Sequence, residues 1–564
     1  MPENQGVLVR IAAALLFGAI SGLALWRTGS RDRAVHRRWL YAAAVTIILV
    51  AVFWTVVWLA LAAARLSYPF EMEWCGGAMK DTVERALHGQ PIYVAPNPGW
   101  FPYEYMPLYF WASALLIRLT HLTAFTGMRL ISSVSTAASA VLMVVWVRML
   151  NPRTPGRLRF TDWAAPAGAV GIFMAAYRIT GAWYDTERLD MLYIALSLLG
   201  CVWLQLAMTA DTRRRSTTYA VLSAAAFALA FLTKQQASLF VIACALALLW
   251  RGKRRLAALF SAASVLLSGV PLWLMNRASH GWLWYYAVHV PLANGTQPSL
   301  ARLFLFRDVP MFAPLLALIL VGLTVLHRGA GEAKSGQSLA LAAAAALSAA
   351  IQSGISRAHF GGYDNVLITA WVWTPVLACA VASRLIAVDA KWLVASAAPL
   401  LLQMLALTYR PTAQLPTPAN FAAGIRFAAT VRRLEQRGAV LVLDHGGFST
   451  PAHFQFMALH DVNAADTGEI RSTRQAIRDG RYDVVITDAY PKSTGLPPEL
   501  AANYSVVQSL DITTGWCLTG YLTPGRGRPG WLLIPNRVPR AKGGHGSGPE
   551  VSTSSRLRLP PQRS

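Results

Sequence analysis

Long apolar segments alternate with short polar segments along the first three quarters of the chain. A helix needs about 20 apolar residues to cross the hydrocarbon core of a bilayer, so each segment predicts one membrane span. The pattern therefore predicts an α-helical polytopic membrane protein with about twelve spans. They fall at residues 7–26, 39–64, 127–149, 162–180, 190–209, 218–233, 236–250, 256–275, 310–327, 338–354, 365–386 and 391–408.

Composition and charge support this fold class. The 564 residues are 55% hydrophobic and 14% charged, whereas soluble domains average about 45–50% apolar and about 25% charged. The net charge of +24 lies largely in alternate loops, among them 148–159, 213–215, 251–255 and 384–391. The positive-inside rule places these loops in the cytoplasm of a multi-pass protein of the cell (inner) membrane. Because the basic residues do not form one soluble face, we expect no nucleic-acid partner.

The chain divides into a membrane part and an outer loop. Residues 1–64 contain the first two spans, and residues 127–409 contain the remaining bundle. Residues 65–126 form a long outer loop, in which the apolar stretch 105–120 resembles a further span. Counting it as a span would put the basic loops outside, against the charge rule. We therefore predict juxtamembrane helices at 78–88 and 105–120, lying in the outer interface.

The carboxy-terminal part has a different composition. Residues 410–535 combine helical apolar spacing with two β-rich runs, GAVLVLDH and YDVVITD, and CLTGYLTP with GWLLIP predicts a hairpin. This indicates a small extracytoplasmic α/β domain. Residues 536–564 are rich in Gly, Ser, Pro and Arg and predict a disordered basic tail.

Two acidic clusters lie at the ends of apolar runs on the predicted outer side. Glu71 and Glu73 lie in YPFEMEWCGG, and Asp185, Glu187 and Asp190 lie in YDTERLDML. Carboxylates that converge from two loops at one membrane face indicate a catalytic or cation-binding site, although solvated loop acids and helix caps are the alternatives. In an extended segment Glu71 and Glu73 point to opposite sides, so only one is expected to enter the site. Glu71 is slightly favoured because it lies nearer the span.

Two further motifs carry candidate site residues. Lys234 interrupts an apolar run, either as a lysine that snorkels from a hairpin tip or as a cation for a phosphate. The segment SRAHFGGYDNVL places polar groups around a glycine pair just before a span, which suits pyrophosphate or sugar binding; a polar turn with a helix cap is the alternative. Its candidate residues are Arg357, His359, Tyr363, Asp364 and Asn365.

These motifs resemble those of bacterial membrane glycosyltransferases of the GT-C superfamily, including protein O-mannosyltransferase-like family 39 and lipid A aminoarabinose transferase-like enzymes. Such proteins have an acidic motif in the first outer loop, then a G-x-x-x-Y segment and a P-P-L-Y-Y-W-like helix. This chain reads GQPIY at 89–93 and MPLYFW at 106–111, and Arg188-Leu189-Asp190 is similar to the R-x-D of family 39. It departs in having Glu where many members have Asp, and Met106 for the first Pro.

The resemblance implies a GT-C-like bundle that transfers a sugar from a polyprenyl-phosphate-linked donor to a glycan, lipid or protein acceptor at the outer face, with inversion. Glu71 or Glu73 would be the catalytic base, and Asp190 the second acidic site residue. A divalent metal ion, Mg²⁺ or Mn²⁺, is a further candidate with no ligand set assigned. The donor phosphate would bind Arg188, Lys234, Arg357 and His359, and the substrate Tyr363, Asp364 and Asn365.

Two other classes of function are alternatives. A secondary transporter would carry coupled ions on intramembrane acids and a lysine, and it would show paired repeats, broken helices and midplane charges. A non-catalytic cell-envelope assembly protein would present the carboxy-terminal domain to partners. In this chain the acids lie at loop ends, and the long outer loop has no evident role in transport.

Overall fold

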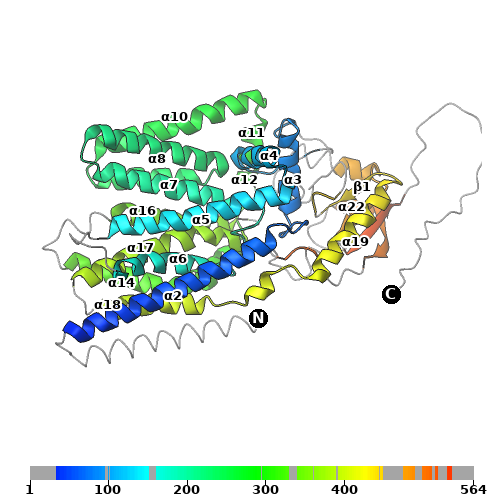
Figure 1. Cartoon of the computed structure of the whole chain (residues 1–564). Helices are drawn as coiled ribbons and strands as arrows, with labels where there is room; N and C mark the ends of the chain where they lie inside the picture. The colour runs from blue at the N-terminus through cyan, green and yellow to red at the C-terminus, as the bar shows by residue number, and fades with distance from the viewer. Residues whose placement is uncertain are drawn as a thin grey trace, which may run out of the picture.

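The computed structural model describes residues 33–536, apart from 96–99, 101, 152–159, 294, 329–338, 360, 389–391, 444, 449–473, 489–497, 511–514 and 519–529. Long helices run side by side in a bundle, and a small α/β domain covers one end of it (Figure 1). The predicted span at 7–26 lies outside the described residues, as does the predicted tail at 536–564 except for its first residue.

Each predicted span from residue 39 onward coincides with a helix of the bundle. Among the described residues, seven helical segments are long and apolar enough to cross a membrane. Shorter apolar helices are α6, α9 and α18 in the bundle and Leu108–Thr120 outside it. The prediction of a helical multi-pass membrane protein is therefore confirmed, while the number of crossings stays a prediction. The bundle helices are α2 (Arg33–Arg65), α5 (Ala124–Leu150), α6 (Ala164–Ala175), α7 (Asp190–Thr209), α8 (Arg213–Thr233), α9 (Ala237–Trp250), α10 (Arg254–Ala278), α14 (Ala313–Arg328), α16 (Ala340–Ala358), α17 (Ile368–Val388) and α18 (Trp392–Ala406).

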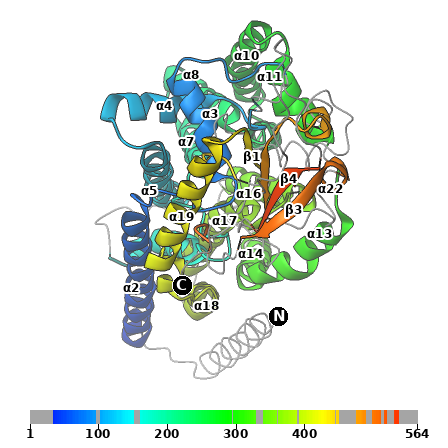
Figure 2. The same cartoon turned by 90° about the vertical axis from the view of Figure 1, so that its right-hand side faces the viewer.

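The segment between α2 and α5 leaves and re-enters the bundle at the same end. Arg129, near the start of α5, donates to the carbonyl oxygens of Tyr68 and Phe70, just beyond the end of α2. The segment contains α3 (Gly76–Leu87) and α4 (Leu108–Thr120). Figures 1 and 2 show α4 lying across the direction of the long helices at that end. A juxtamembrane helix would occupy this position.

Short helical elements complete the same end of the bundle. They connect α10 to α14 and α16 to α17. These are α11 (Trp282–Trp284), the π-helix η2 (Tyr285–His289), α12 (Val290–Ala293), α13 (Pro298–Leu303), the π-helix η3 (Phe304–Asp308), and the 3₁₀-helices η4 (Val309–Phe312) and η5 (Asp364–Leu367).

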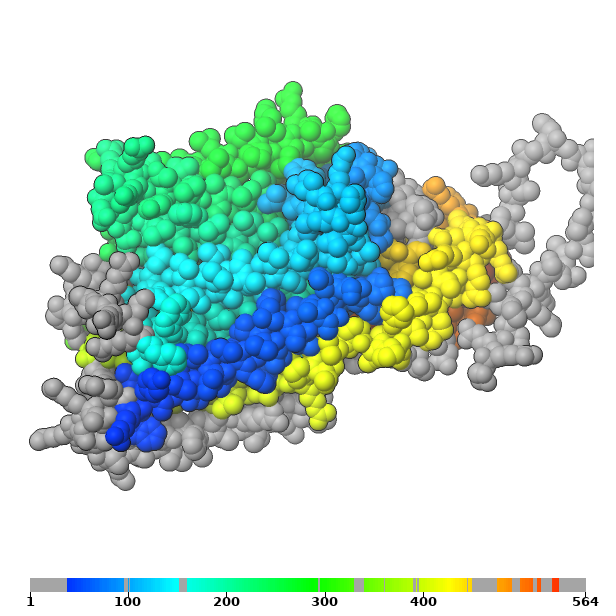
Figure 3. Space-filling model, in the orientation of Figure 1, coloured from blue at the N-terminus to red at the C-terminus, as the bar shows by residue number. Residues whose placement is uncertain are grey.

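The interior of the bundle is formed around α17, while α10 lies at its periphery. Within the span windows, 89% of α17 residues are buried against 11% for α10, whose Val265, Leu266 and Trp273 are exposed. Exposed apolar side chains are expected where lipid replaces water as the solvent. Gly200 of α7 allows close helix packing, because a Cβ there would lie 2.7 Å from the Phe227 ring of α8. In the space-filling view of Figure 3, α2 runs along the surface of the bundle.

The carboxy-terminal domain contains one mixed sheet of order β1-β2-β4-β3. Its strands are β1 (Val440–Val442), β2 (Val484–Thr487), β3 (Tyr504–Ser509) and β4 (Trp531–Pro535), with helices α19 (Pro418–Glu435) and α22 (Pro498–Asn503). β1 pairs with β2 in parallel, and β4 pairs antiparallel with both β2 and β3. In the predicted hairpin of CLTGYLTP with GWLLIP, the first strand lies mostly outside the described residues, and the second is β4.

Candidate active site

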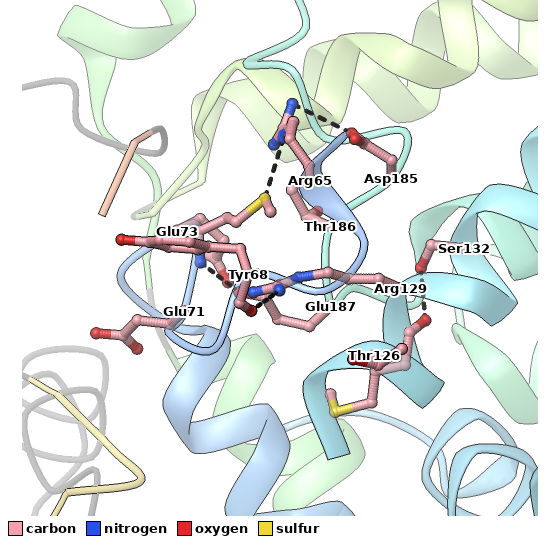
Figure 4. A network of polar contacts seen from close by, with 12 residues as sticks. Arg65, Tyr68, Glu71, Glu73, Thr126, Arg129, Ser132, Asp185, Thr186 and Glu187 are labelled. Atoms are coloured by element: carbon pink, nitrogen blue, oxygen red, sulfur yellow. Dashed lines mark hydrogen bonds and ion pairs between the residues drawn. The ribbon is translucent and has the colours of Figure 1, made fainter. Parts of the chain in front are cut away.

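Two buried ion pairs join the second acidic loop to α2 and α5, the helices that flank the first acidic loop. Arg129 Nε lies 2.6 Å from Glu187 Oε2, and Arg65 Nη1 lies 3.3 Å from Asp185 Oδ1. The amide of Met72 donates to Glu187 Oε1 at 2.6 Å. Figure 4 shows Arg129 reaching from α5 to the backbone of the first loop and to Glu187. Asp185 and Glu187 therefore hold the acidic loops together, a role that depends on cations the sequence analysis did not consider.

The two glutamates of the first acidic loop, Glu71 and Glu73, contact different partners. Both side chains are buried. Glu73 accepts from the amide of Cys75 at 3.1 Å and faces Arg188, whose Nη1 lies 3.5 Å from Oε1. Glu71 contacts His445 of the carboxy-terminal domain instead, and its carboxylate points away from the Arg129 network in Figure 4. Residues at i and i+2 thus face different sides, as expected for an extended segment.

Four residues form a row of alternating charges, which we call the Glu73 cluster: Glu73, Arg188, Asp190 and Lys234. Arg188 Nε lies 3.9 Å from Asp190 Oδ2, and Lys234 Nζ lies 2.6 Å from Asp190 Oδ1. Asp190 begins α7, Lys234 follows the last residue of α8, and Arg188 lies in the second outer loop. All four are at least nine-tenths buried. Two carboxylates and two cations thus meet at the domain-covered end of the bundle.

Aromatic side chains enclose the Glu73 cluster. Tyr103 and Tyr105 stack with ring centroids 5.1 Å apart. Their hydroxyl oxygens lie 3.0 and 3.4 Å from the guanidinium nitrogens of Arg188. The guanidinium also lies 4.9 Å from the centroid of Trp183, a favourable cation–π arrangement. The sequence analysis did not assign these residues to the site, although their aromatic segment FPYEYMP was a signal that could have identified the two tyrosines.

Burial and neighbouring charges set the protonation of this cluster. Burial raises the pKa of Glu73 to about 8, and the Arg188 cation opposes this shift. Burial lowers the pKa of Lys234, but the adjacent Asp190 carboxylate and Tyr105 together outweigh burial, so the Lys234 pKa is raised overall. Lys234 is therefore a cation at neutral pH, whereas Glu73 exchanges its proton near physiological pH.

Part of the predicted cassette at 356–367 meets the Glu73 cluster. The side chain of Asn365 forms a hydrogen bond with Asp190, and the Tyr363 ring packs edge-on against Trp74, with centroids 5.6 Å apart. The side-chain amide nitrogen Nε2 of Gln236, two residues after Lys234, donates to the Ser356 hydroxyl at 2.6 Å. The α8–α9 connection and the cassette are therefore in direct contact.

The other cassette residues bond to each other and to neighbouring loops. Arg357 is fully buried, with Nε 2.7 Å from Asp308 Oδ2 and Nη2 2.6 Å from Asp364 Oδ1. It also donates from Nη1 to the carbonyl oxygen of Gly362 at 2.7 Å. His359 Nε2 lies 2.7 Å from the carbonyl oxygen of Pro291. In this arrangement Arg357, His359 and Asp364 shape the cassette.

Glu71 belongs to a separate buried cluster at the boundary with the carboxy-terminal domain. Besides His445, it accepts from the amide of Gly77 at 2.7 Å and from the indole nitrogen of Trp516 at 3.2 Å. Burial raises the pKa of Glu71, although His445 opposes this. In the part of the chain that the structure describes, Glu71, His445 and Cys517 are the one group of three potential metal donors found, and it includes neither Glu73 nor Asp190.

Comparisons with known proteins identify similar folds. No family model matches the chain, and no curated protein is significantly similar to it in sequence. ArnT from Cupriavidus metallidurans in the apo state is 14% identical with a TM-score of 0.52, over 88% of this chain and 98% of that chain. The same protein bound to undecaprenyl phosphate gives 14% identity and a TM-score of 0.50, over 87% and 98% of the two chains.

A second solved structure, the apo oligosaccharyltransferase of Archaeoglobus fulgidus, is 10% identical with a TM-score of 0.45, over 83% of this chain and 73% of that chain. At 14% identity the likeness to ArnT shows a shared fold, and function has to be argued from the site. The chain therefore shares the fold of ArnT; its motifs predict a GT-C-like bundle.

Proposed function

We propose that this protein is an integral membrane glycosyltransferase of the inner membrane. It moves a sugar from a polyprenyl-phosphate-linked donor to a glycan, lipid or protein acceptor at the outer face. The observation that carries this proposal is the Glu73 cluster, in which a buried carboxylate with a raised pKa faces the buried cation Arg188, and a second buried cation, Lys234, pairs with Asp190. ArnT, which has a similar fold, has been solved bound to undecaprenyl phosphate, and this supports a lipid-linked donor.

The residues of the cluster fit the two charge changes of the reaction. Glu73 takes the proton from the acceptor group as its oxygen or nitrogen forms a bond to the anomeric carbon. The bond from that carbon to the donor phosphate oxygen breaks on the opposite face, and the phosphate leaves with an added negative charge. Arg188 and Lys234 stabilise that charge, because buried cations act strongly where water is excluded. Asp190 accepts a hydrogen bond from Lys234 and lies 3.9 Å from Arg188, so its charge holds both cations in place.

Glu73 is a better candidate for the base than Glu71, which the position in the sequence slightly favoured. Both oxygens of Glu71 already accept hydrogen bonds within the boundary with the carboxy-terminal domain. Glu73 instead faces Arg188, which contacts the hydroxyl oxygens of Tyr103 and Tyr105. We accordingly assign the phosphate to Arg188 and Lys234, substrate contact to Tyr363 and Asn365, and cassette geometry to the other candidates, Arg357, His359 and Asp364.

A divalent ion does not fit the Glu73 cluster as it is arranged. Asp190 is bound by Lys234 at 2.6 Å, and Glu73 faces Arg188. A Mg²⁺ or Mn²⁺ ion there would compete with two positively charged side chains for the same oxygens and would be repelled by them. We therefore derive no step through a metal at this cluster.

The positions of the buried charges argue against a secondary transporter. A transporter is expected to carry charged groups near the bilayer midplane, at broken helices. Among the described residues of the long bundle helices and their ends, the buried charged side chains lie at or near helix ends: Arg65, Arg129, Asp190, Lys234, Arg357 and Arg384. Asp308, at the end of η3, pairs with Arg357. A screen of polyprenyl-phosphate sugars with the purified protein and an added acceptor fraction tests the proposal. Release of polyprenyl phosphate from one donor would support it, and no release from any donor class would contradict it.

The proposed orientation predicts opposite labelling of two exposed positions. Gln90 lies in the first outer loop and Asp211 lies in the connection between α7 and α8, next to the arginine run 213–215. A membrane-impermeant maleimide should label Gln90→Cys in intact spheroplasts, but Asp211→Cys only after lysis, because basic loops stay in the cytoplasm. The reverse pattern would refute the orientation.

Turnover should rise with pH through one ionisation near pH 8 and then level off. Burial raises the pKa of Glu73 to about 8, and only its deprotonated form accepts a proton, so activity is lost as the pH falls below this value. Because the Arg188 cation opposes this rise in the pKa of Glu73, Arg188→Met should move the increase in turnover to higher pH. A turnover profile that is flat across this range, or an unmoved increase in Arg188→Met, would contradict the assignment.

A further inference from the structure

A second buried cluster joins the first outer loop to the carboxy-terminal domain. His445 Nδ1 contacts Glu71 Oε1, and His445 Nε2 lies 3.2 Å from Asp488 Oδ1. Cys517 Sγ lies 3.5 Å from the same Glu71 oxygen. One donor atom from each of Glu71, His445 and Cys517 lies within 4.8 Å of the other two. None of the five cysteines, all of which the structure describes, forms a disulfide.

Two glycines bring these side chains together. A Cβ on Gly77 would lie 2.2 Å from the carbonyl oxygen of Gly446, and a Cβ on Gly446 would lie 2.5 Å from the amide nitrogen of Ala78. Any larger residue would therefore push the loop that carries His445 away from α3. The Trp516 ring packs 5.0 Å from the His445 ring and covers it. Glu71 and His445 are both 1% exposed and Cys517 is partly exposed, so the close approach creates a largely buried group of donors.

We propose that Glu71, His445 and Cys517 bind a zinc ion that ties the first outer loop to the carboxy-terminal domain. Thiolate, imidazole and carboxylate are all zinc donors, and the sulfur and nitrogen favour zinc over the hard cations Mg²⁺ and Ca²⁺. Zinc lies about 2.0–2.3 Å from such donors, so small side-chain rotations would bring these three into reach. A solvent molecule would complete a tetrahedral site.

Asp488 supports this assignment from the far side of the imidazole. Metal-bound histidines usually donate their other ring N–H to a carboxylate, which fixes the tautomer and the ring orientation. Asp488 lies where it can accept from Nε2 and leave Nδ1 facing Glu71 and Cys517. Zinc would take the place of the thiol proton of Cys517 and of the proton between His445 and Glu71, and both protons would pass to solvent. Because Glu71 is two residues from Glu73, a bound ion would also fix the loop that carries Glu73.

Metal analysis of the full-length protein tests this site without any assay of activity. Protein purified in detergent, stripped with a chelator, loaded with Zn²⁺ and then desalted should retain about one zinc per chain. The stripped protein loaded with Co²⁺ should show the thiolate-to-metal charge-transfer band and the visible bands of tetrahedral cobalt. No retained zinc, or a cobalt spectrum without the thiolate band, in the wild-type protein would overturn the proposal.

Substitutions then locate the ion. His445→Ala and Cys517→Ser should each lower retained zinc at least tenfold, and Asp488→Asn should weaken zinc binding by about 10–100-fold. His88→Ala and Cys244→Ala are matched controls that remove the same residue types elsewhere and should retain the ion. Equal zinc in Cys517→Ser and wild type would also overturn the proposal. These readouts are independent of the glycosyltransferase assignment, so either proposal can fail without the other.

Discussion

Replacing Glu73 by Gln should lower turnover by about 10²–10⁴-fold, the usual effect of removing a general base. The amide keeps the shape of the side chain and its bond to the Cys75 amide, but it cannot take a proton from the acceptor. Initial rates at saturating donor, with the expression level and thermal unfolding midpoint measured in parallel, would separate a chemical loss from a folding defect.

Two other glutamates make this experiment specific. Glu84→Gln changes an exposed residue of α3 that pairs with Lys80 at 2.8 Å, and it should turn over like the wild type. Glu71→Gln changes the boundary with the carboxy-terminal domain and should lose less activity than Glu73→Gln, because the Glu71 oxygens are already engaged there. Near-wild-type turnover by Glu73→Gln would show that Glu73 is not the catalytic base.

Replacing Arg129 by Ala should lower the free energy of unfolding by about 3–5 kcal/mol, because it leaves the buried Glu187 carboxylate without its cation. Both side chains are fully buried and 2.6 Å apart, and Arg129 also bonds to two loop carbonyls. Thermal or denaturant unfolding in a fixed detergent would measure the change, with folding reported by tryptophan fluorescence.

Arg215→Ala is the matched control for this prediction. Arg215 pairs with Asp211 at 4.0 Å, but the two side chains are 66% and 88% exposed. Solvent screens such a pair, so its loss should change the free energy of unfolding by less than about 1 kcal/mol. If the two arginine variants were equally stable, the Arg129–Glu187 pair would not be the clamp between the outer loops.

The helical bundle could be predicted from the sequence because lipid imposes strong local rules. About 20 apolar residues are needed for each crossing, and basic loops mark one side. The same charge rule predicted that residues 105–120 are not a span of the bundle. In the structure, α4 lies across the end of the bundle. The alternation along an extended segment predicted that Glu71 and Glu73 would face different surroundings. It could not say which surroundings each would meet.

The rest depended on contacts between residues far apart in the chain. His445 meets Glu71 across 374 positions, and Arg129 meets Glu187 across 58. A local pattern cannot pair such residues. The sequence therefore could not show that Asp185 and Glu187 hold the two loops together whereas Asp190 belongs to the Glu73 cluster. The motif Asp444-His445-Gly446-Gly447 gave only a weak sequence signal, because it is too short for a nucleotide fingerprint. The role of Gly446 becomes evident only from its approach to Gly77.

Transfer by the purified protein in proteoliposomes tests the central claim most directly. The vesicles would contain a polyprenyl-phosphate sugar labelled in both the lipid and the sugar, identified by the donor screen, and an acceptor fraction would be added outside. We predict release of polyprenyl phosphate in equal amount to sugar transferred, carried out by the wild type and lost in Glu73→Gln. An intact donor, or equal transfer by Glu73→Gln, would contradict the proposal that the Glu73 cluster is a glycosyltransferase active site.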